Sequence, residues 1–372
     1  MKTIKLFAMA AIAVVIGLSS CKKNEGAPQP SDEQQFKVTL RLQNAETRAD
    51  GALAVAGTKV GINDGYICFV SANDAITDVY TISGDPTSGK NIQNSDLGST
   101  AVILEGVPGT SVNVYMIANK GAVANFVAPA VGGTMTSYMA NNMDVRDQGL
   151  YTGVTSVGNA ALVAGSDPNT KTAAITLSTD VSRIQIKGIT FNGEVTGKVA
   201  GIFINGYYPT MQLNGTAGTL AKSNIDVDYN EVSGSAIFPI ALKTFVFDDL
   251  QGKTFNATVS TPATVVPTTA NGAWGYNLFK SATPQIIIKL TDVVVGGQAL
   301  AADQFITING FKNTTTSAVI TELEGGMIYT ISTESLVIKY ENMSIDPGVT
   351  PINVEVTVIP VTWKVTDVIP NI

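Results

Sequence analysis

The sequence predicts an all-β protein built of antiparallel β-sandwiches, and three observations carry this prediction. Glycine is abundant, with 35 residues, and Thr, Val and Ser recur, which favours strands and tight turns over helices. Short strand-like runs follow one another, with turn signals such as Asn63-Asp64-Gly65 between them. No long stretch combines a helical period with good helix formers. The length of 372 residues suggests two domains, and we place their boundary in the polar link from Leu177 to Val181.

The bulk composition excludes several functions. A net charge of −7 and a pI near 4.7 repel phosphate backbones, so no nucleic-acid partner is expected. The chain contains no histidine, which excludes a Ser-His-Asp triad, a Cys-His dyad, HExxH zinc sites and any His-ligated metal. The two cysteines are Cys21 and Cys68, so no disulfide framework is expected if Cys21 is modified.

The N-terminus is typical of an export signal. A lysine-containing start precedes an apolar run at 6–18 that is too short for a stable transmembrane helix. Leu18-Ser19-Ser20-Cys21 resembles a lipobox, so residues 1–20 are predicted to be a lipoprotein signal peptide and Cys21 the lipidated residue. An ordinary signal peptide with an incidental cysteine is the alternative. Residues 22–31 are polar and contain proline, which is typical of a disordered tether.

The first predicted strand follows this tether. In Phe36-Lys37-Val38-Thr39-Leu40-Arg41-Leu42-Gln43, apolar and polar residues alternate, and alternate side chains of a strand share a face. One buried face is therefore expected to hold Phe36, Val38, Leu40 and Leu42. The next segment, 44–51, is small and polar, as are the exposed loops that proteases cut. A trypsin-like enzyme would cleave it between Arg48 and Ala49.

Further strand-like runs lie at 66–70, 110–118, 172–177, 182–189, 199–204, 244–247, 285–290 and 326–332. Between them, the segment 120–170 mixes Gly, Ala, Met and Asn without a clear pattern. Short helices or irregular loops are expected there.

The C-terminal segment is predicted to contain a further strand beyond the final strand of the second domain. Apolar residues alternate with polar ones on both sides of Pro360, at Ile352, Val354, Val356 and Val358 before it and at Val361, Trp363 and Val365 after it. Proline lacks an N–H and interrupts a sheet ladder, so residues 361–372 are predicted to form a separable strand. An ordinary last strand of the second domain is the alternative.

The two ends of the chain carry the same alternating pattern. Removal of residues up to Arg48 would delete the first strand and expose apolar side chains and unpaired backbone groups. The terminal strand of a second molecule has the periodicity to replace it, as in donor-strand complementation. An intact first strand competes at an effective concentration that no neighbour matches, so cleavage would be the switch.

Several segments resemble motifs of the fimbrillin family, the type V pilins of Gram-negative surface pili. They are Thr110–Asn119 (TSVNVYMIAN), Ile175–Ile189 (ITLSTDVSRIQIKGI), Val199–Pro209 (VAGIFINGYYP) and Leu323–Tyr329 (LEGGMIY). In the second segment, Thr179 stands where the family usually has Arg, and Ser182 where Ala is usual. The Trp363 tail is similar to the family's terminal strand. The order of these segments, with the lipobox and the arginine site, spans nearly the whole chain.

The resemblance implies two tandem transthyretin-like Greek-key sandwiches, at 49–180 and 181–372. It implies export as an outer-membrane lipoprotein precursor and cleavage after Arg48 by an arginine-specific protease. The product would be a head-to-tail homopolymer in a cell-surface fimbrium that also contains other pilus subunits. Residues 21–48 would be a tether plus a removable strand, and 361–372 the donor strand. A chain with both a cut site and a donor strand fits a shaft subunit best.

The sequence offers little for catalysis or metal binding. Asp226–Asn230 opens like a calcium loop, but the pattern fails at Glu231 and Ile237. Asp248 and Asp249 are adjacent, so on a strand their side chains would point apart. Cys68 lies in an apolar strand, where a buried inert thiol is expected. We expect no enzyme activity, no cofactor and no metal.

The alternative function is a monomeric cell-surface lipoprotein that binds glycan. Its platform could be formed by Trp274, Tyr276, Tyr207 and Tyr208, although aromatic residues of β proteins belong more often to the core. Such a protein would need a lipidated Cys21 but neither cleavage nor a spare strand. A glycoside hydrolase would need a carboxylate pair that no spacing in the sequence singles out.

Overall fold

The computed structural model describes residues 35–43, 59–60, 62–82, 90–93, 97, 102–120, 127–144, 154–221, 247–268, 272–347, 350–360 and 362–363. Nearly all regular elements among them are β-strands, so the predicted all-β sandwich class is confirmed. The α-helix in these residues, α1 (Met135–Met139), lies in the segment 120–170, where short helices or loops are expected. In the described part of the chain, no helix has the length and apolar character needed to cross a bilayer.

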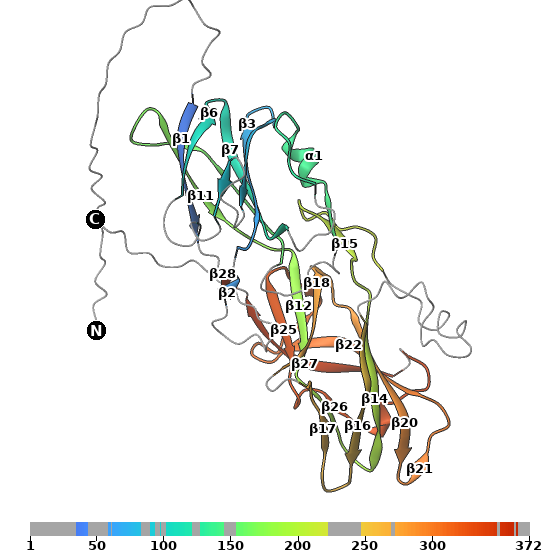
Figure 1. Cartoon of the computed structure of the whole chain (residues 1–372). Helices are drawn as coiled ribbons and strands as arrows, with labels where there is room; N and C mark the ends of the chain where they lie inside the picture. The colour runs from blue at the N-terminus through green and yellow to red at the C-terminus, as the bar shows by residue number, and fades with distance from the viewer. Residues whose placement is uncertain are drawn as a thin grey trace, which may run out of the picture. The chain divides into compact units, whose positions relative to one another are not determined.

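Two sheets are built from the residues that precede Leu177. One has the strand order β10 (Val163–Ala164), β11 (Thr170–Thr176), β1 (Gln35–Gln43) and β6 (Val102–Pro108). The other has the order β5 (Asn91–Ile92), β4 (Ile76–Ile82), β3 (Gly65–Ser71), β7 (Ser111–Ala118) and β9 (Ser156–Ala161). Figure 1 labels β3 and β7 of this sheet. Both contribute buried side chains to the core, among them Val38 and Leu104 from the first sheet and Phe69 and Met116 from the second. Two sheets that share a core in this way form a β-sandwich.

The largest sheet among the described residues after Thr179 has ten strands. Its strands run in the order β16 (Phe247–Ala257), β14 (Val195–Asn205), β20 (Gln285–Val295), β22 (Gln304–Asn313), β27 (Pro351–Pro360), β25 (Met327–Ile331), β12 (Val181–Ile186) and β18 (Trp274–Phe279). A smaller sheet has the order β17 (Ala263–Val265), β13 (Ile189–Phe191) and β26 (Val337–Ile338). The stacked rings of Phe191 and Phe255, with centroids 3.6 Å apart, join the two sheets.

The remaining strands are short. β21 (Gln298–Ala299) pairs with β20, β23 (Val319–Ile320) pairs with β22, and β19 (Ser281–Ala282) pairs with β24 (Glu322–Leu323). The 3-10 turn η6 (Tyr340–Asn342) follows β26.

The predicted strand runs fall on observed strands in most cases. They correspond to β3, β7, β11, β14, β20 and β25, and the run 182–189 divides into β12 and β13. The run 244–247 lies outside the described residues except for its last position.

The polar link Ser178–Asp180 separates the two groups of sheets. Across it, the named strands of the described residues form two ladders, β8 (Asn142–Asp144) with β15 (Thr210–Gln212) and β2 (Lys59–Val60) with β28 (Thr362–Trp363). The division into domains at 49–180 and 181–372, and their transthyretin-like topology, stay predictions.

A pair of substitutions on β11 tests the packing of the first sandwich. The side chain of Ile175 is fully buried, whereas Thr172 on the same strand is exposed. We expect Ile175→Ala to lower the free energy of unfolding by ~2–5 kcal/mol, because the lost methyl groups leave a cavity. Thr172→Ala should change it by less than ~0.5 kcal/mol. Urea unfolding followed by circular dichroism measures both, and a larger loss for Thr172→Ala than for Ile175→Ala would show that β11 faces the other way.

Candidate strand-exchange site

Strand β1 lies between two neighbours in its sheet (Figure 1). It pairs in parallel with β11 from Lys37 to Gln43 and in antiparallel fashion with β6 from Gln35 to Leu40. A strand paired on both edges has its backbone N–H and C=O groups satisfied within the sheet. Its removal would leave two rows of unpaired groups facing each other. We call the place that β1 occupies between β6 and β11 the β1 site.

The described side chains of β1 alternate between core and solvent, as the sequence predicts. Val38 and Leu40 are 0% and 3% exposed, while Gln35 and Lys37 are exposed. The side chains of Phe36 and Leu42 lie outside the described residues, although their backbones belong to the strand. A vacated β1 site would therefore expose apolar core.

Strand β6 forms the outer wall of the β1 site. Within the described residues it pairs with β1 alone, so without β1 it would have no ladder in this sheet. Its side chains Leu104 and Val107 are buried in the core, and the turn at Gly109–Thr110 connects it to β7. These features hold β6 on the sandwich through its side chains and through the turn that leads into the opposite sheet.

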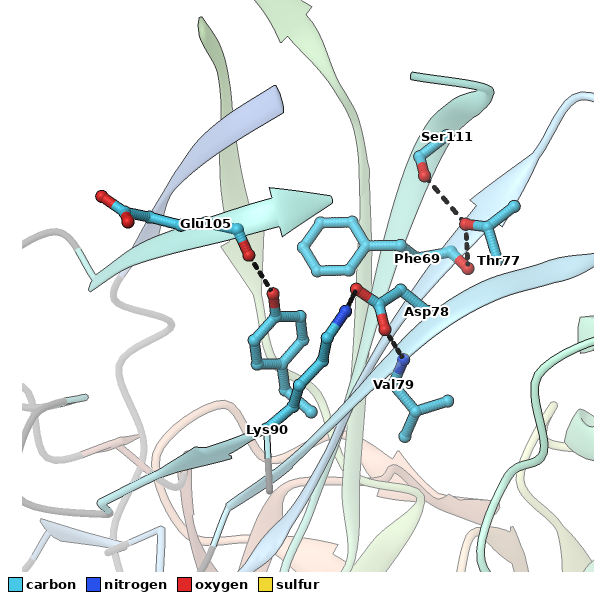
Figure 2. A network of polar contacts seen from close by, with 8 residues as sticks. Phe69, Thr77, Asp78, Val79, Lys90, Glu105 and Ser111 are labelled. Carbon is cyan, nitrogen blue, oxygen red and sulfur yellow. Dashed lines mark hydrogen bonds and ion pairs between the residues drawn. The ribbon is translucent and has the colours of Figure 1, made fainter. Parts of the chain in front are cut away.

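A hydrogen bond from the opposite sheet also anchors β6. The Tyr80 hydroxyl on β4 donates to the backbone oxygen of Glu105 at 2.7 Å (Figure 2). Burial and, to a smaller extent, the charges of Asp78 and Glu105 raise the pKa of Tyr80 to about 12. The hydroxyl therefore keeps its proton, and stays a donor, at neutral pH. The bond does not involve β1, so it can hold the outer wall when β1 is absent.

The Tyr80 ring is itself held in place by its neighbours. Phe69 on β3 packs edge-on against it, with centroids 5.8 Å apart, and Lys90 Nζ lies 5.2 Å from its centroid. Lys90 also pairs with the carboxylate of Asp78, which is 5% exposed and accepts a hydrogen bond from the Val79 N–H (Figure 2). A buried carboxylate is tolerated when it is paired and hydrogen-bonded in this way.

Strand β11, the inner wall of the β1 site, has anchors of its own. Lys171 Nζ donates to the backbone oxygens of Gly109 at 3.3 Å and Ser111 at 2.7 Å. Burial lowers the pKa of Lys171. Just beyond β11, Ser178 exchanges two backbone hydrogen bonds with Val157 of β9, at 2.8 and 2.9 Å. Both walls are therefore tied to the opposite sheet by contacts that exclude β1.

One surface ion pair does depend on β1. Lys37 Nζ lies 2.8 Å from Glu105 Oε1, and this hydrogen bond and charge lower the pKa of Glu105. Both side chains are well exposed, and exposed pairs contribute little to stability. The buried face and the two ladders, rather than this ion pair, hold β1 in place.

The last two described strands, β27 and β28, lie just before the predicted donor strand and within it. In β27, Val354 and Val356 are buried, and the ladder with β25 includes Pro360, which pairs with Met327. The separation of a further strand beyond Pro360 stays a prediction. Beyond it, Thr362–Trp363 forms the short β28, which pairs in parallel with Lys59–Val60. Val361 and Val365 lie outside the described residues.

The predicted processing residues Cys21, Arg48 and Ala49 also lie outside the described residues, as does the calcium-like segment 226–237. Asp248 and Asp249 belong to β16, opposite Ile202 and Gly201, and their side chains are not described. In the described part of the chain, no cluster of three or more His, Cys, Asp or Glu residues could hold a metal ion.

Two hypotheses about buried residues are decided by the structure. Cys68 is fully buried, and burial raises its pKa to about 12, which agrees with the predicted inert thiol. Trp274, Tyr276 and Tyr207 are buried and Tyr208 is half-buried, so these four residues do not form an exposed glycan platform.

Sequence reasoning missed Tyr80 and Lys171. A usable signal for Tyr80 was the alternation of β4, in which Ile76, Tyr80 and Ile82 face the core. The partner oxygens of Tyr80 and Lys171 are backbone atoms of other strands and turns, and no side-chain pattern marks them.

No protein-family model matches the sequence, and no curated protein matches it. Solved structures resemble it. A candidate cell adhesion protein from Bacteroides eggerthii has a TM-score of 0.51 and 14% identity, over 89% of this chain and 96% of that chain. A fimbrial assembly protein from Parabacteroides distasonis has a TM-score of 0.39 and 12% identity, over 80% of this chain and 90% of that chain. The tip fimbrial protein Mfa3 from Porphyromonas gingivalis has a TM-score of 0.37 and 10% identity, over 80% and 94%. The chain shares the fold of the Bacteroides eggerthii protein.

Removal of the Tyr80 hydroxyl tests the anchor of the outer wall. We expect Tyr80→Phe to lower the free energy of unfolding by ~0.5–1.5 kcal/mol, because the Glu105 oxygen loses a buried donor. Tyr115→Phe on β7 is the matched control, since Tyr115 is only half-buried. Chemical denaturation of both variants makes the comparison, and an equal loss would show that the Tyr80 hydroxyl does not anchor β6.

Proposed function

We propose that the chain is the precursor of a structural pilus subunit of the fimbrillin kind, which polymerises when a protease removes β1 and the C-terminal strand of another subunit replaces it. Export as an outer-membrane lipoprotein through Cys21 and cleavage after Arg48 by an arginine-specific protease belong to this proposal. The product is a shaft subunit in a cell-surface fimbrium, joined to copies of itself and to other pilus subunits.

The place of β1 carries the proposal. It is the first strand of the described residues, and it is paired along both edges. Its two walls have anchors to the opposite sheet that do not involve it, through Tyr80 and Lys171. Loss of β1 by cleavage would therefore vacate a strand-shaped site while its walls stay attached.

The free energy gained when a strand binds in the vacated β1 site is substantial. Burial of side chains like Val38 and Leu40 stabilises by ~1.5–3 kcal/mol each. Each backbone hydrogen bond of the two ladders adds about 1 kcal/mol net. A foreign strand that restores the apolar face and both ladders would recover most of this free energy.

Cleavage decides which strand occupies the site. In the uncut chain β1 is covalently tethered, so its effective concentration exceeds that of any neighbour's tail. After a cut at Arg48, β1 is a separate peptide and this advantage ends. The precursor accordingly stays monomeric until it is processed.

The fold comparison supports a surface role. The Bacteroides eggerthii protein of the same fold is a candidate cell adhesion protein, and pili are adhesive structures. The glycan-binding alternative loses support, because its aromatic platform is largely buried.

Limited proteolysis tests the proposal directly. Trypsin at low dose should remove residues up to Arg48 from the purified precursor and convert monomers into SDS-resistant ladders. N-terminal sequencing and unheated gels measure the two events. Soluble monomers that persist after complete loss of β1 would contradict strand exchange.

The variant Arg48→Ala tests whether cleavage at this site is needed for polymerisation. Arg48→Ala should leave export and folding unchanged and abolish the ladders at the same trypsin dose, because the tethered β1 keeps its site. Ladders that form equally well from the uncut variant would show that cleavage is not the switch.

Adjacent substitutions in the tail test which face of the donor is buried. Trp363→Asp should reduce ladder formation far more than Thr362→Asp, because neighbouring residues of a strand point to opposite faces and a carboxylate buried without a partner is costly. Densitometry of ladders from cleaved subunits compares the two variants. Equal losses would mean that the assigned face is wrong.

A further inference from the structure

We infer that the donor strand enters the β1 site in the direction of β1 itself, with Val361 in the place of Val38 and Trp363 in the place of Leu40. This inference rests on the proposed strand exchange. It adds the direction and register of the incoming strand, and so the residues that set its specificity.

In this alignment the tail repeats β1 residue by residue. Val38-Thr39-Leu40-Arg41-Leu42-Gln43 corresponds to Val361-Thr362-Trp363-Lys364-Val365-Thr366. The first two residues are identical, the third and fifth are large and apolar in both segments, and the fourth is a cation in both.

The structure gives each of these positions a defined environment. Positions 38 and 40 face the core, where Val38 and Leu40 are 0% and 3% exposed. Position 39 lies opposite Ile103 on β6 and Thr172 on β11, both of which are exposed. A slip by one residue would turn the apolar set of the tail to solvent.

The indole of Trp363 is larger than the side chain of Leu40, which it would replace at position 40. The residues opposite it are Ala173 on β11, which is small, and Val102 at the start of β6, which is only half-buried. Within the sheet, these two partners leave room on either side of the indole.

A shift of the tail by two residues in either direction would also keep its apolar side chains on the core face. Asp367 excludes one of these two registers and Pro360 excludes the other. If the tail slides so that Trp363 replaces Val38, Asp367 falls at position 42, opposite the fully buried Ile175. A carboxylate there would be buried without a partner. If it slides the other way, Pro360 falls at position 39, in the middle of both ladders, where its missing N–H breaks the pairing.

In the inferred register, Pro360 falls at position 37, near the end of the site. The Lys37 N–H donates to Asn169 O at 3.1 Å, so one hydrogen bond is forgone there. The ladder with β6 is irregular at this point, between Phe36 and Val38, and Gly106 on β6 has a φ of 76°. Bulges are among the few places where a sheet accepts proline.

The same two tail residues exclude a strand that enters in the opposite direction. With Trp363 again at position 40, reversal puts Asp367 at position 36, opposite the fully buried Val107. A further slide by two residues puts either Asp367 at the buried position 38 or Pro360 at position 41 within the ladder with β11.

Disulfide formation between subunits measures the register. In the inferred register Thr362 lies directly opposite Ile103, and such antiparallel partners have Cα atoms ~4.5–5.5 Å apart, within the range of a disulfide. Ile103→Cys subunits and size-tagged Thr362→Cys subunits are mixed, cleaved with trypsin and oxidised mildly. We expect both to shift to a heterodimer that survives heating in SDS without reductant. Each variant oxidised alone controls for disulfides through the native Cys68.

Lys364→Cys is the matched control, because it lies on the same face of the tail and meets position 103 only if the tail is slid or reversed. A heterodimer with Lys364→Cys, or ladders without any heterodimer, would overturn the register and leave strand exchange intact. No ladders from the cleaved wild-type protein would overturn the proposed function itself. Thr172→Cys on β11, paired with Thr362→Cys, repeats the measurement from the other wall if Ile103→Cys does not fold.

Discussion

The two-sided pairing of β1 is the constraint on which the rest of the first sandwich depends. An edge strand could leave and cost one ladder, but β1 separates β6 from β11 and completes both. Its described inward side chains, Val38 and Leu40, are as buried as those of the core strands. A sheet that lacks this strand is therefore both divided and open to water, and either β1 or an equivalent strand has to occupy the position.

The sandwich nevertheless keeps the two walls in place by means other than β1. Tyr80 reaches from one sheet to the backbone of β6 in the other, and Lys171 reaches from β11 to the turn after β6. Each bond is worth about 1 kcal/mol net, which is small beside the burial of apolar side chains. These hydrogen bonds matter mainly for geometry. They constrain the distance between β6 and β11, and so the fit of the strand that lies between them.

The sequence predicted those strands that have one face on the core and one in water. β1 and β27 have alternating sequences, and this alternation correctly predicts that Val38, Leu40, Val354 and Val356 are buried. β12 is different, because all six of its residues are buried and three are polar. Gln185 donates to Thr330 at 2.7 Å and Arg183 to Asn277 at 3.3 Å, contacts that depend on which strands lie alongside. A periodic pattern cannot assign such residues to the interior.

Local sequence patterns also could not predict which strands pair with one another. β1 is parallel to β11, a strand far along the chain, and no turn signal joins them. The Tyr80 contact depends on how two sheets lie on each other, and its acceptor is a backbone atom. Alternation thus predicted the burial of the described inward side chains of β1 and of Val354 and Val356 in β27. The pairing and the anchors of the β1 site needed three-dimensional structure.

The distance along the chain between β1 and its partners has a consequence for folding. Loops that long close slowly, so contacts of this kind form late. The pairing of β1 with β6 and β11 is therefore expected to follow pairings between sequence neighbours, such as that of β3 with β4. Until β1 has docked, the apolar side chains that line its site are open to solvent, and exposed apolar surface of this kind favours aggregation. A variant in which β1 docks slowly would therefore aggregate more readily during folding.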